Sequence, residues 1–186
     1  MNRMKLLSVS ALILVSALTV IAKTKEEKQA EARKKADQVL ARLYKASPSA
    51  EGQIKTAAGY AVFSNAGMKI LMAGGGKGKG IAVDNATQKV VYMKMREVQA
   101  GLGMGVKKFS TIFVFETKDK LDQFTNSGWE FGGQTTAAAK TSEGGGALQG
   151  AVSVSPGVWM YQLTDKGLAL ELTGKGTKYS KDDDLN

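Results

Sequence analysis

The stretch YAVFSNAGMKILMAGGGKGKGIAVD, residues 60–84, decides the fold of this 186-residue chain. Its segments YAVF, MKILMA and GIAVD have the length and composition of short β-strands. Glycines within such a stretch are typical of bends and of close strand approaches. We interpret AGGGKGKG (73–80) as a tight turn on which Lys77 and Lys79 are either two cations within reach of a phosphate group or two solvated turn residues.

The same glycine cluster does not match a nucleotide-binding motif. A phosphate loop needs G-x-x-x-x-G-K-[ST], but around Gly78 and Lys79 the first position is Ala73 and the last is Gly80. The dinucleotide fingerprint G-x-G-x-x-G also fails, because Lys79 or Ile81 stands where its last glycine is required. A nucleotide-dependent enzyme is therefore not expected.

Two helices are predicted before this stretch. Residues 23–46 are rich in Ala, Glu, Lys and Gln, and a narrow apolar stripe covers the second half of this segment. A second, short helix begins at Ser47-Pro48 and ends at Gly59. The first helix either packs on the core or lies on a membrane surface. Its basic residues off the stripe are Lys34, Lys35, Arg42 and Lys45.

A mostly antiparallel sheet is predicted after the stretch. In KVVYMKMREV, residues 89–98, period two points Val91, Met93 and Met95 to one face and Tyr92, Lys94 and Arg96 to the other. The segment 109–116 is predicted to be a strand that is buried on both faces near its centre. A short helix is predicted to follow Thr117 and to end at Gly128. Residues 165–167 are predicted to form a hairpin turn.

These elements predict an α+β fold. N-terminal helices precede a strongly coiled, mostly antiparallel, glycine-rich sheet or barrel with one inserted short helix. We expect one domain over residues 23–180, helical over 23–58 and mostly β over 59–180. Residues 181–186 are predicted to be an acidic, disordered tail.

Composition narrows the chemistry. The chain has no Cys and no His, which excludes disulfides and removes the commonest general base and metal ligand. Its carboxylates are scattered, and Asp182 to Asp184 lack the spacing of a calcium loop. We expect no enzyme activity, no metal and no cofactor. A net charge of +9 without a nucleic-acid motif suits an anionic membrane surface better than nucleic acid, and solubility is the alternative use of the lysines.

The N-terminal segment 1–22 is predicted to be a secretory signal peptide. Arg3 and Lys5 precede the apolar run LLSVSALILVSALTVIA, and Ala22 provides a cleavage site before Lys23. An uncleaved anchor helix is the alternative, although the run is short for a membrane span. Without a Cys at the site, a lipoprotein is not expected, so the protein is predicted to be exported and periplasmic or envelope-associated.

Several segments resemble the SYLF domain, a family described as lipid-binding or actin-regulating. AAGYAVFSNAGMKILMAGGGKGKGIAV, residues 57–83, is similar to the family's opening strand, glycine cluster and next strand. Residues 100–124 resemble its middle strands and helix, 132–140 its alanine-rich strand after that helix, and 158–184 its closing segment. The resemblance covers about residues 34–183.

The resemblance implies non-enzymatic binding of anionic phospholipids, whereas actin binding does not suit an exported protein. In the family, a basic helix before the sheet is implicated, a role that falls by position on Lys34, Lys35, Arg42 and Lys45. The alternative is a structural or interaction protein that docks on an envelope protein, with the helix used only for packing. The other candidate lipid contacts are Lys77, Lys79, Lys107 and Lys108, of which the last two depart from the family's small polar pair.

Overall fold

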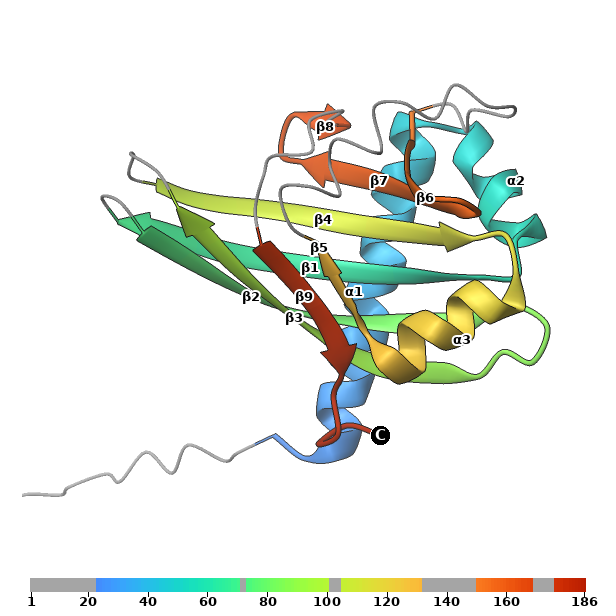
Figure 1. The fold of residues 1–186 in the computed structure, drawn as a ribbon, viewed down its shortest axis with the longest axis horizontal. Coiled ribbons are helices and arrows are strands. Elements are labelled where there is room, and N and C mark those ends of the chain that lie inside the picture. Colours follow the sequence, from blue (N-terminus) through green and yellow to red (C-terminus); the bar gives the residue numbers. More distant parts are fainter. Residues whose placement is uncertain (1–22, 71–72, 101–104, 132–149, 169–175) are drawn as a thin grey trace, which may run out of the picture.

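The protein is a curled antiparallel sheet with helices on its two faces (Figure 1). The computed structural model describes residues 23–70, 73–100, 105–131, 150–168 and 176–186, so the predicted signal peptide lies outside the described residues. The side chains of 65–70, 73–74, 98–100, 105–108 and 131 are likewise outside the description. The described helices are α1 (Lys25–Ala46), α2 (Ser49–Thr56) and α3 (Lys118–Ser127).

The predicted helices form, with small shifts at their ends. α1 begins with a capping box, in which the Thr24 hydroxyl accepts from the Glu27 amide at 3.2 Å and the Glu27 carboxylate accepts from the Thr24 amide at 2.9 Å. α2 starts one residue later than predicted, because Pro48 rather than Ser47 is its N-cap residue. α3 has the predicted Thr117 cap and ends at Gly128, whose φ of 71° favours glycine.

One sheet joins all the described strands. Its order is β5-β9-β3-β2-β1-β4-β7-β6, with β8 paired to β7, and every described pairing is antiparallel. In the described residues the path stays open, with β5 and β6 at its edges. The strands are β1 (Gly59–Ile70), β2 (Ala73–Asp84), β3 (Val90–Ala100), β4 (Gly105–Phe115), β5 (Trp129–Phe131), β6 (Val152–Ser155), β7 (Val158–Thr164), β8 (Gly167–Leu168) and β9 (Gly176–Lys181).

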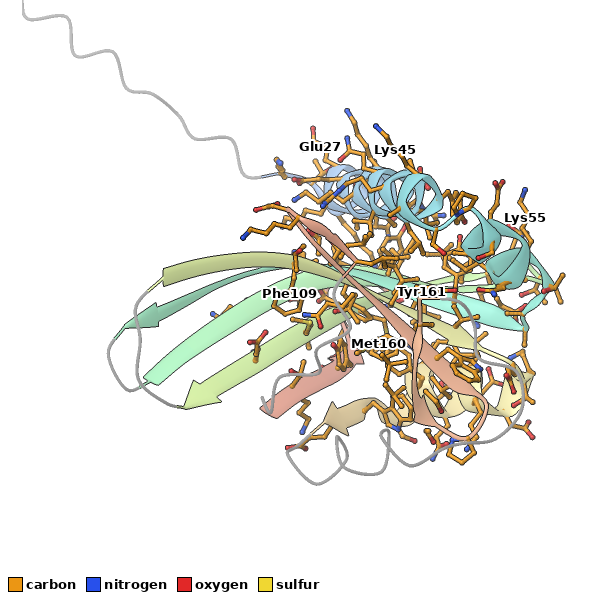
Figure 2. All side chains as sticks on the ribbon, turned by 90° about the horizontal axis from the view of Figure 1, so that it is seen from above. Glu27, Lys45, Lys55, Phe109, Met160 and Tyr161 are labelled. Carbon is orange, nitrogen blue, oxygen red and sulfur yellow. The ribbon has the colours of Figure 1, made fainter. Side chains whose placement is uncertain are left out.

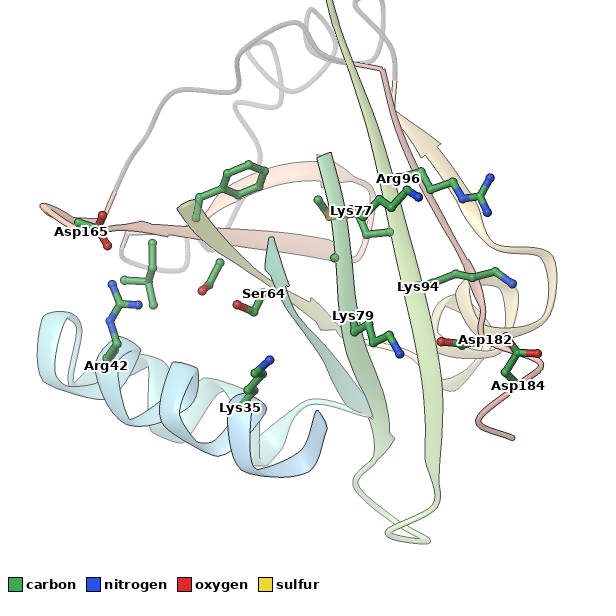
Figure 3. A pocket seen from close by; sticks show the side chains of 15 residues that line it. Lys35, Arg42, Ser64, Lys77, Lys79, Lys94, Arg96, Asp165, Asp182 and Asp184 are labelled. Atoms are coloured by element: carbon green, nitrogen blue, oxygen red, sulfur yellow. The ribbon is translucent and has the colours of Figure 1, made fainter. Parts of the chain in front are cut away.

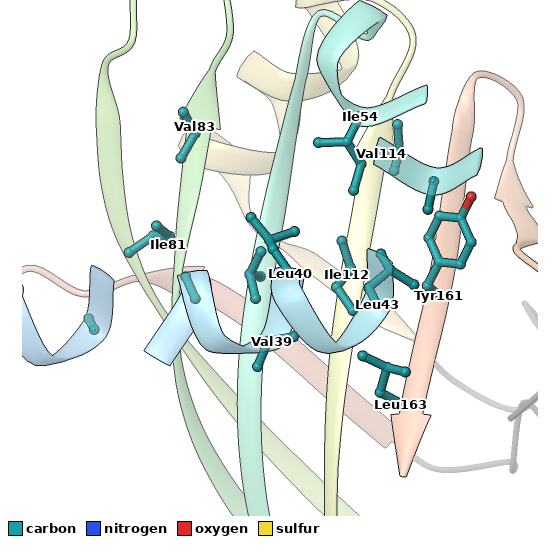
Figure 4. Close-up of a cluster of buried hydrophobic side chains, with 14 of the residues drawn as sticks. Val39, Leu40, Leu43, Ile54, Ile81, Val83, Ile112, Val114, Tyr161 and Leu163 are labelled. Carbon is teal, nitrogen blue, oxygen red and sulfur yellow. The ribbon is translucent and has the colours of Figure 1, made fainter. Parts of the chain in front are cut away.

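Two apolar clusters lie on opposite faces of this sheet. On the α1 face, the helix residues Leu40 and Leu43 pack over Ile112 and other strand residues (Figure 4). On the α3 face, Phe113 and Phe124 belong to a cluster of aromatic and methionine side chains. β4 contributes to both clusters, as predicted, because its central residues alternate between the faces and are at most 1% exposed.

The glycine-rich stretch differs from its interpretation as a turn. Residues 73–80 lie inside β2, and Ile70 pairs with Ala73, so the chain reverses between these two positions. β1 and β2 are each 12 residues long rather than several short strands. A close approach explains one of the glycines, because a Cβ on Gly80 would lie 2.2 Å from the Val62 carbonyl oxygen and 2.5 Å from the Phe63 ring.

The C-terminal residues are packed rather than disordered, contrary to the prediction. Leu185 is 1% exposed and belongs to the α1-face cluster. The Asn186 side chain accepts from the Tyr92 amide at 3.0 Å and donates to the Tyr92 carbonyl at 2.8 Å. The acidic composition of the segment concealed this single apolar anchor and its backbone contacts.

Candidate anion-binding groove

A groove of about 700 Å³ lies between α1 and the part of the sheet that α1 leaves uncovered (Figure 3). This volume is within the range of ligand sites in proteins. Its floor includes the hydroxyl residues Ser64 on β1 and Ser110 on β4, which pair directly across the two strands. We call it the cationic groove, because six basic side chains line it: Lys35, Arg42, Lys77, Lys79, Lys94 and Arg96.

Four of these cations come from the β2–β3 hairpin. Lys77 pairs directly with Arg96, and Lys79 pairs directly with Lys94. In a β-pair, directly opposed side chains have Cβ atoms about 5 Å apart, and like charges there are destabilising. All four residues lie on the α1 face, because they continue the alternation of Ile81 and Tyr92, both in the α1-face cluster.

The helix contributes only half of its predicted site residues to the groove. Lys35 and Arg42 are seven residues apart, so they lie on the same flank of α1 and both line the groove. Lys34 and Lys45 are exposed on the side of α1 away from its buried stripe and do not line the groove. Figure 2 shows Lys45 pointing away from the sheet.

The cations at the helix wall and at one end of the groove have partners. The Lys35 ammonium lies 3.0 Å from the Glu31 carboxylate, and the Arg42 guanidinium donates to the Thr164 carbonyl at 2.9 Å. The Lys94 ammonium lies 3.7 Å from the carboxylate of Asp183, a side chain that is 83% exposed. These contacts orient Lys35 and Arg42 at the helix wall and Lys94 at one end of the groove, which together we call the rim.

The central cations differ from those at the rim. Among the residues that the structure describes, Lys77, Lys79 and Arg96 form no salt bridge. Arg96 also pairs across β3–β9 with Lys178, whose other neighbour is Glu130 on β5. Three basic side chains on the sheet side of the groove therefore have no salt-bridge partner among the described residues.

One carboxyl group beside the groove is strongly perturbed. The Lys23 ammonium and then the Lys35 ammonium bind the Glu31 carboxylate and lower its pKa to about 2. Glu31 therefore stays ionised below pH 4.5 as well, and its carboxylate lies 3.0 Å from the Lys35 ammonium at the helix wall.

Two residues that carry much of the groove charge were not among the predicted site residues. The sequence predicted the face on which Lys94 and Arg96 lie, but residues 73–80 were interpreted as a turn, so these two residues were not placed opposite Lys77 and Lys79. The hairpin turn at residues 85–88 supplies the signal for this placement, because a tight turn fixes the register of both strands. Lys107 and Lys108 lie on β4 opposite Gly67 and Ala66, and their side chains are outside the described residues.

Two further observations concern metal-binding side chains and helix length in the described part of the chain. It contains no group of three or more His, Cys, Asp or Glu side chains that could hold a metal ion. Of the three described helices, none combines the length and the apolar character needed to cross a membrane. The lining of the groove suits an oxyanion, because its donors are ammonium, guanidinium and hydroxyl groups.

The fold defines a mixed α+β protein built on a curled antiparallel sheet. A family model described as "Ysc84: Las17-binding protein actin regulator" matches residues 96–186. "Beta cell expansion factor A" of Aeromonas veronii is 34% identical over 163 residues, which is 88% of this chain and 60% of the length of that protein. This match over residues 96–186 confirms the resemblance to the SYLF (Ysc84) family seen in the sequence.

Proposed function

We propose that this chain is a non-enzymatic module that binds the head groups of anionic phospholipids in the cationic groove. The observation that carries the proposal is the pair of directly opposed cations, Lys77 with Arg96 and Lys79 with Lys94. A bound phosphate group offsets this repulsion and accepts charge-assisted hydrogen bonds from both strands. The family match and the net charge of +9 support the proposal.

The proposal places the head group in the groove rather than under the outer face of α1. Lys35 and Arg42 would then contribute from the helix wall, while Lys34 and Lys45 would not touch the ligand. Each basic residue near an anionic membrane contributes about 1 kcal/mol, so losing two of them weakens binding roughly thirtyfold.

Cosedimentation with phospholipid vesicles tests this placement. The variant Lys77→Gln/Arg96→Gln removes two groove cations, and Lys34→Gln/Lys45→Gln removes the same charge from the outer helix face. We expect wild type to bind phosphatidylglycerol vesicles in a salt-sensitive manner and phosphatidylcholine vesicles weakly. The groove variant should lose most of this binding and the helix variant little. Equal losses, or a larger loss in the helix variant, contradict the groove as the contact.

We also propose that the chain is exported to the cell envelope. Support comes from the charged and apolar pattern of residues 1–22. Cell fractionation followed by N-terminal sequencing tests this, with Lys23 as the expected first residue of the exported form. A cytoplasmic protein that retains Met1 contradicts the proposal.

An acidic protein surface is the second candidate ligand. The family description names a protein, Las17, as the binding partner of that family. The same opposed cations would bind clustered carboxylates, which carry one negative charge each, as does the phosphodiester of a phospholipid. If the protein leaves anionic vesicles unbound but crosslinks to an envelope protein through Lys77 and Lys79, this alternative replaces lipid binding.

A further inference from the structure

Carboxylates stand at both ends of the cationic groove (Figure 3). Asp165 lies at one end, next to Thr164, whose carbonyl oxygen accepts from Arg42 at 2.9 Å. At the other end Asp182 and Asp184 line the groove beyond β9, and Asp183 contacts Lys94 at 3.7 Å. Along the direction of α1, the groove is therefore positive in its centre and bounded by negative charge.

Local structure holds these carboxylates in place. At the Asp165 end, the Thr164 hydroxyl donates to the Gly167 carbonyl at 3.1 Å and accepts from the Lys166 amide at 3.2 Å, which fixes the turn. At the other end, the Asp182 amide donates to the Tyr92 carbonyl at 2.9 Å, and the buried Leu185 anchors the segment. The negative ends of the groove are thus built into the fold rather than carried on a free tail.

The centre of the groove suits a compact ligand. Lys77 and Lys79 are two residues apart on one strand, so the two opposed cation pairs are separated by about 7 Å along the strands. A ligand with one or two phosphate groups can contact Lys77, Lys79 and Arg96 without reaching either end. A chain of phosphates laid along α1 meets Asp165 at one end and the Asp182–Asp184 segment at the other.

We propose that the terminal carboxylates are selectivity elements, which restrict the groove to compact phosphate anions and reject extended polyanions. This inference rests on the proposed function, because it specifies which anions the same groove accepts. The compact anion is either a lipid head group or a free phosphate compound. The mechanism is like-charge repulsion, which costs an extended polyanion affinity at each end and leaves the compact ligand unaffected.

Calorimetric titration of the full chain with pyrophosphate and with long-chain polyphosphate tests this selectivity. The variant Asp165→Asn/Asp183→Asn/Asp184→Asn removes three exposed carboxylates at the two ends. We expect its affinity for polyphosphate to rise on the order of tenfold, because exposed charge pairs each contribute modestly. Its affinity for pyrophosphate should rise much less, so the ratio of the two affinities should change.

A matched control separates local repulsion from net charge. The variant Glu26→Gln/Glu51→Gln/Asp119→Asn removes three exposed carboxylates elsewhere on the surface. It should shift both affinities equally and leave their ratio unchanged. If the ratio changes equally in both triple variants, or in neither, the inference is overturned. Circular dichroism verifies that each variant is folded.

Vesicle binding distinguishes this inference from the proposed function. If wild type binds pyrophosphate with the expected selectivity but leaves phosphatidylglycerol vesicles unbound, the inference holds for a free phosphate compound and the lipid proposal fails. If vesicles bind through Lys77 and Arg96 while the end variant shows no gain toward polyphosphate, lipid binding holds and the inference is overturned.

Discussion

The two faces of the β2–β3 hairpin differ in what the fold requires of them. On the α3 face, glycines of β2 alternate with the groove lysines, and Met93 and Met95 of β3 are at most 1% exposed. The ring of Phe63 packs against Gly80 in this cluster. On the α1 face, the same strands carry four cations over the groove. Beyond Ile81 and Tyr92, which pack under α1, the α3 face of the hairpin is therefore defined by packing and the α1 face by charge.

The contrast separates residues that maintain the fold from residues that are available for a ligand. Removing an aromatic side chain from the α3 face leaves a cavity. Removing a cation from the groove relieves repulsion between opposed like charges. Substitutions on the two faces should therefore change the free energy of unfolding in opposite directions.

The largest expected effect is on the aromatic face. Phe113 is fully buried, and its ring centroid lies 5.0 Å from that of Tyr179 and 5.4 Å from that of Phe124. Phe113→Ala should lower the free energy of unfolding by about 3–5 kcal/mol, because it leaves a cavity among these rings. Urea unfolding followed by circular dichroism measures this, with Phe113→Leu as a milder control. A loss below about 1 kcal/mol contradicts the tightly packed cluster.

A similar but more variable loss is expected at the C-terminal anchor. Leu185→Ala should lower the free energy of unfolding by about 2–5 kcal/mol, because the side chain is 1% exposed within the α1-face cluster. The neighbouring Asp183→Asn, at a side chain that is 83% exposed, should change it little. Urea unfolding compares both variants with wild type. Equal stability of all three supports the disordered tail that composition predicted.

The sequence predicted most of the fold because its signals are local. Thr117 and Gly128 bound α3 as expected, and the alternation of KVVYMKMREV places Met93 and Tyr92 on opposite faces. Such features depend on caps and on strand periodicity, which a single segment contains.

The groove could be predicted only in part, because it depends on register between segments. Lys77 and Lys79 were identified as cations of a tight turn, but they lie on β2, and their partners Lys94 and Arg96 follow only from the pairing of β2 with β3. The helix residues were selected as basic residues off the apolar stripe, and only the packing of α1 against the sheet separates Lys35 from Lys34. The docking of Leu185 was missed for the same reason, since a single apolar residue in a polar segment has no period.

A small effect of opposite sign is expected on the groove face. Lys77→Gln/Arg96→Gln should raise the free energy of unfolding by about 0.2–1 kcal/mol, because it removes one directly opposed pair of like charges. The gain should shrink at high salt, which screens exposed charges. Urea unfolding at two salt concentrations measures it, with Lys34→Gln/Lys45→Gln as the matched control. A groove variant that is less stable than wild type contradicts the view that these cations serve a ligand rather than the fold.

The smallest expected effect concerns Glu31, which fixes Lys35 at the wall of the groove. Lys23 and Lys35 lower the pKa of the Glu31 carboxyl from 4.5 to about 2 in the folded protein, so its stabilising contribution is present above pH 4.5 and is lost as the pH falls toward 2. Glu31→Gln lacks this contribution at every pH, whereas Glu26→Gln, another exposed carboxylate of α1, retains it.

Urea midpoints measured above pH 4.5 and near pH 2 test this. The gap between wild type and Glu31→Gln should be small, since exposed ion pairs contribute little, and it should close on acidification. The gap between wild type and Glu26→Gln should not follow the same course. A gap for Glu31→Gln that widens toward low pH contradicts the assigned ion pairs. In Glu31→Gln, Lys35 also loses its carboxylate partner. This variant should therefore bind anionic vesicles slightly more tightly than wild type, because the Lys35 ammonium at the helix wall becomes available to the ligand.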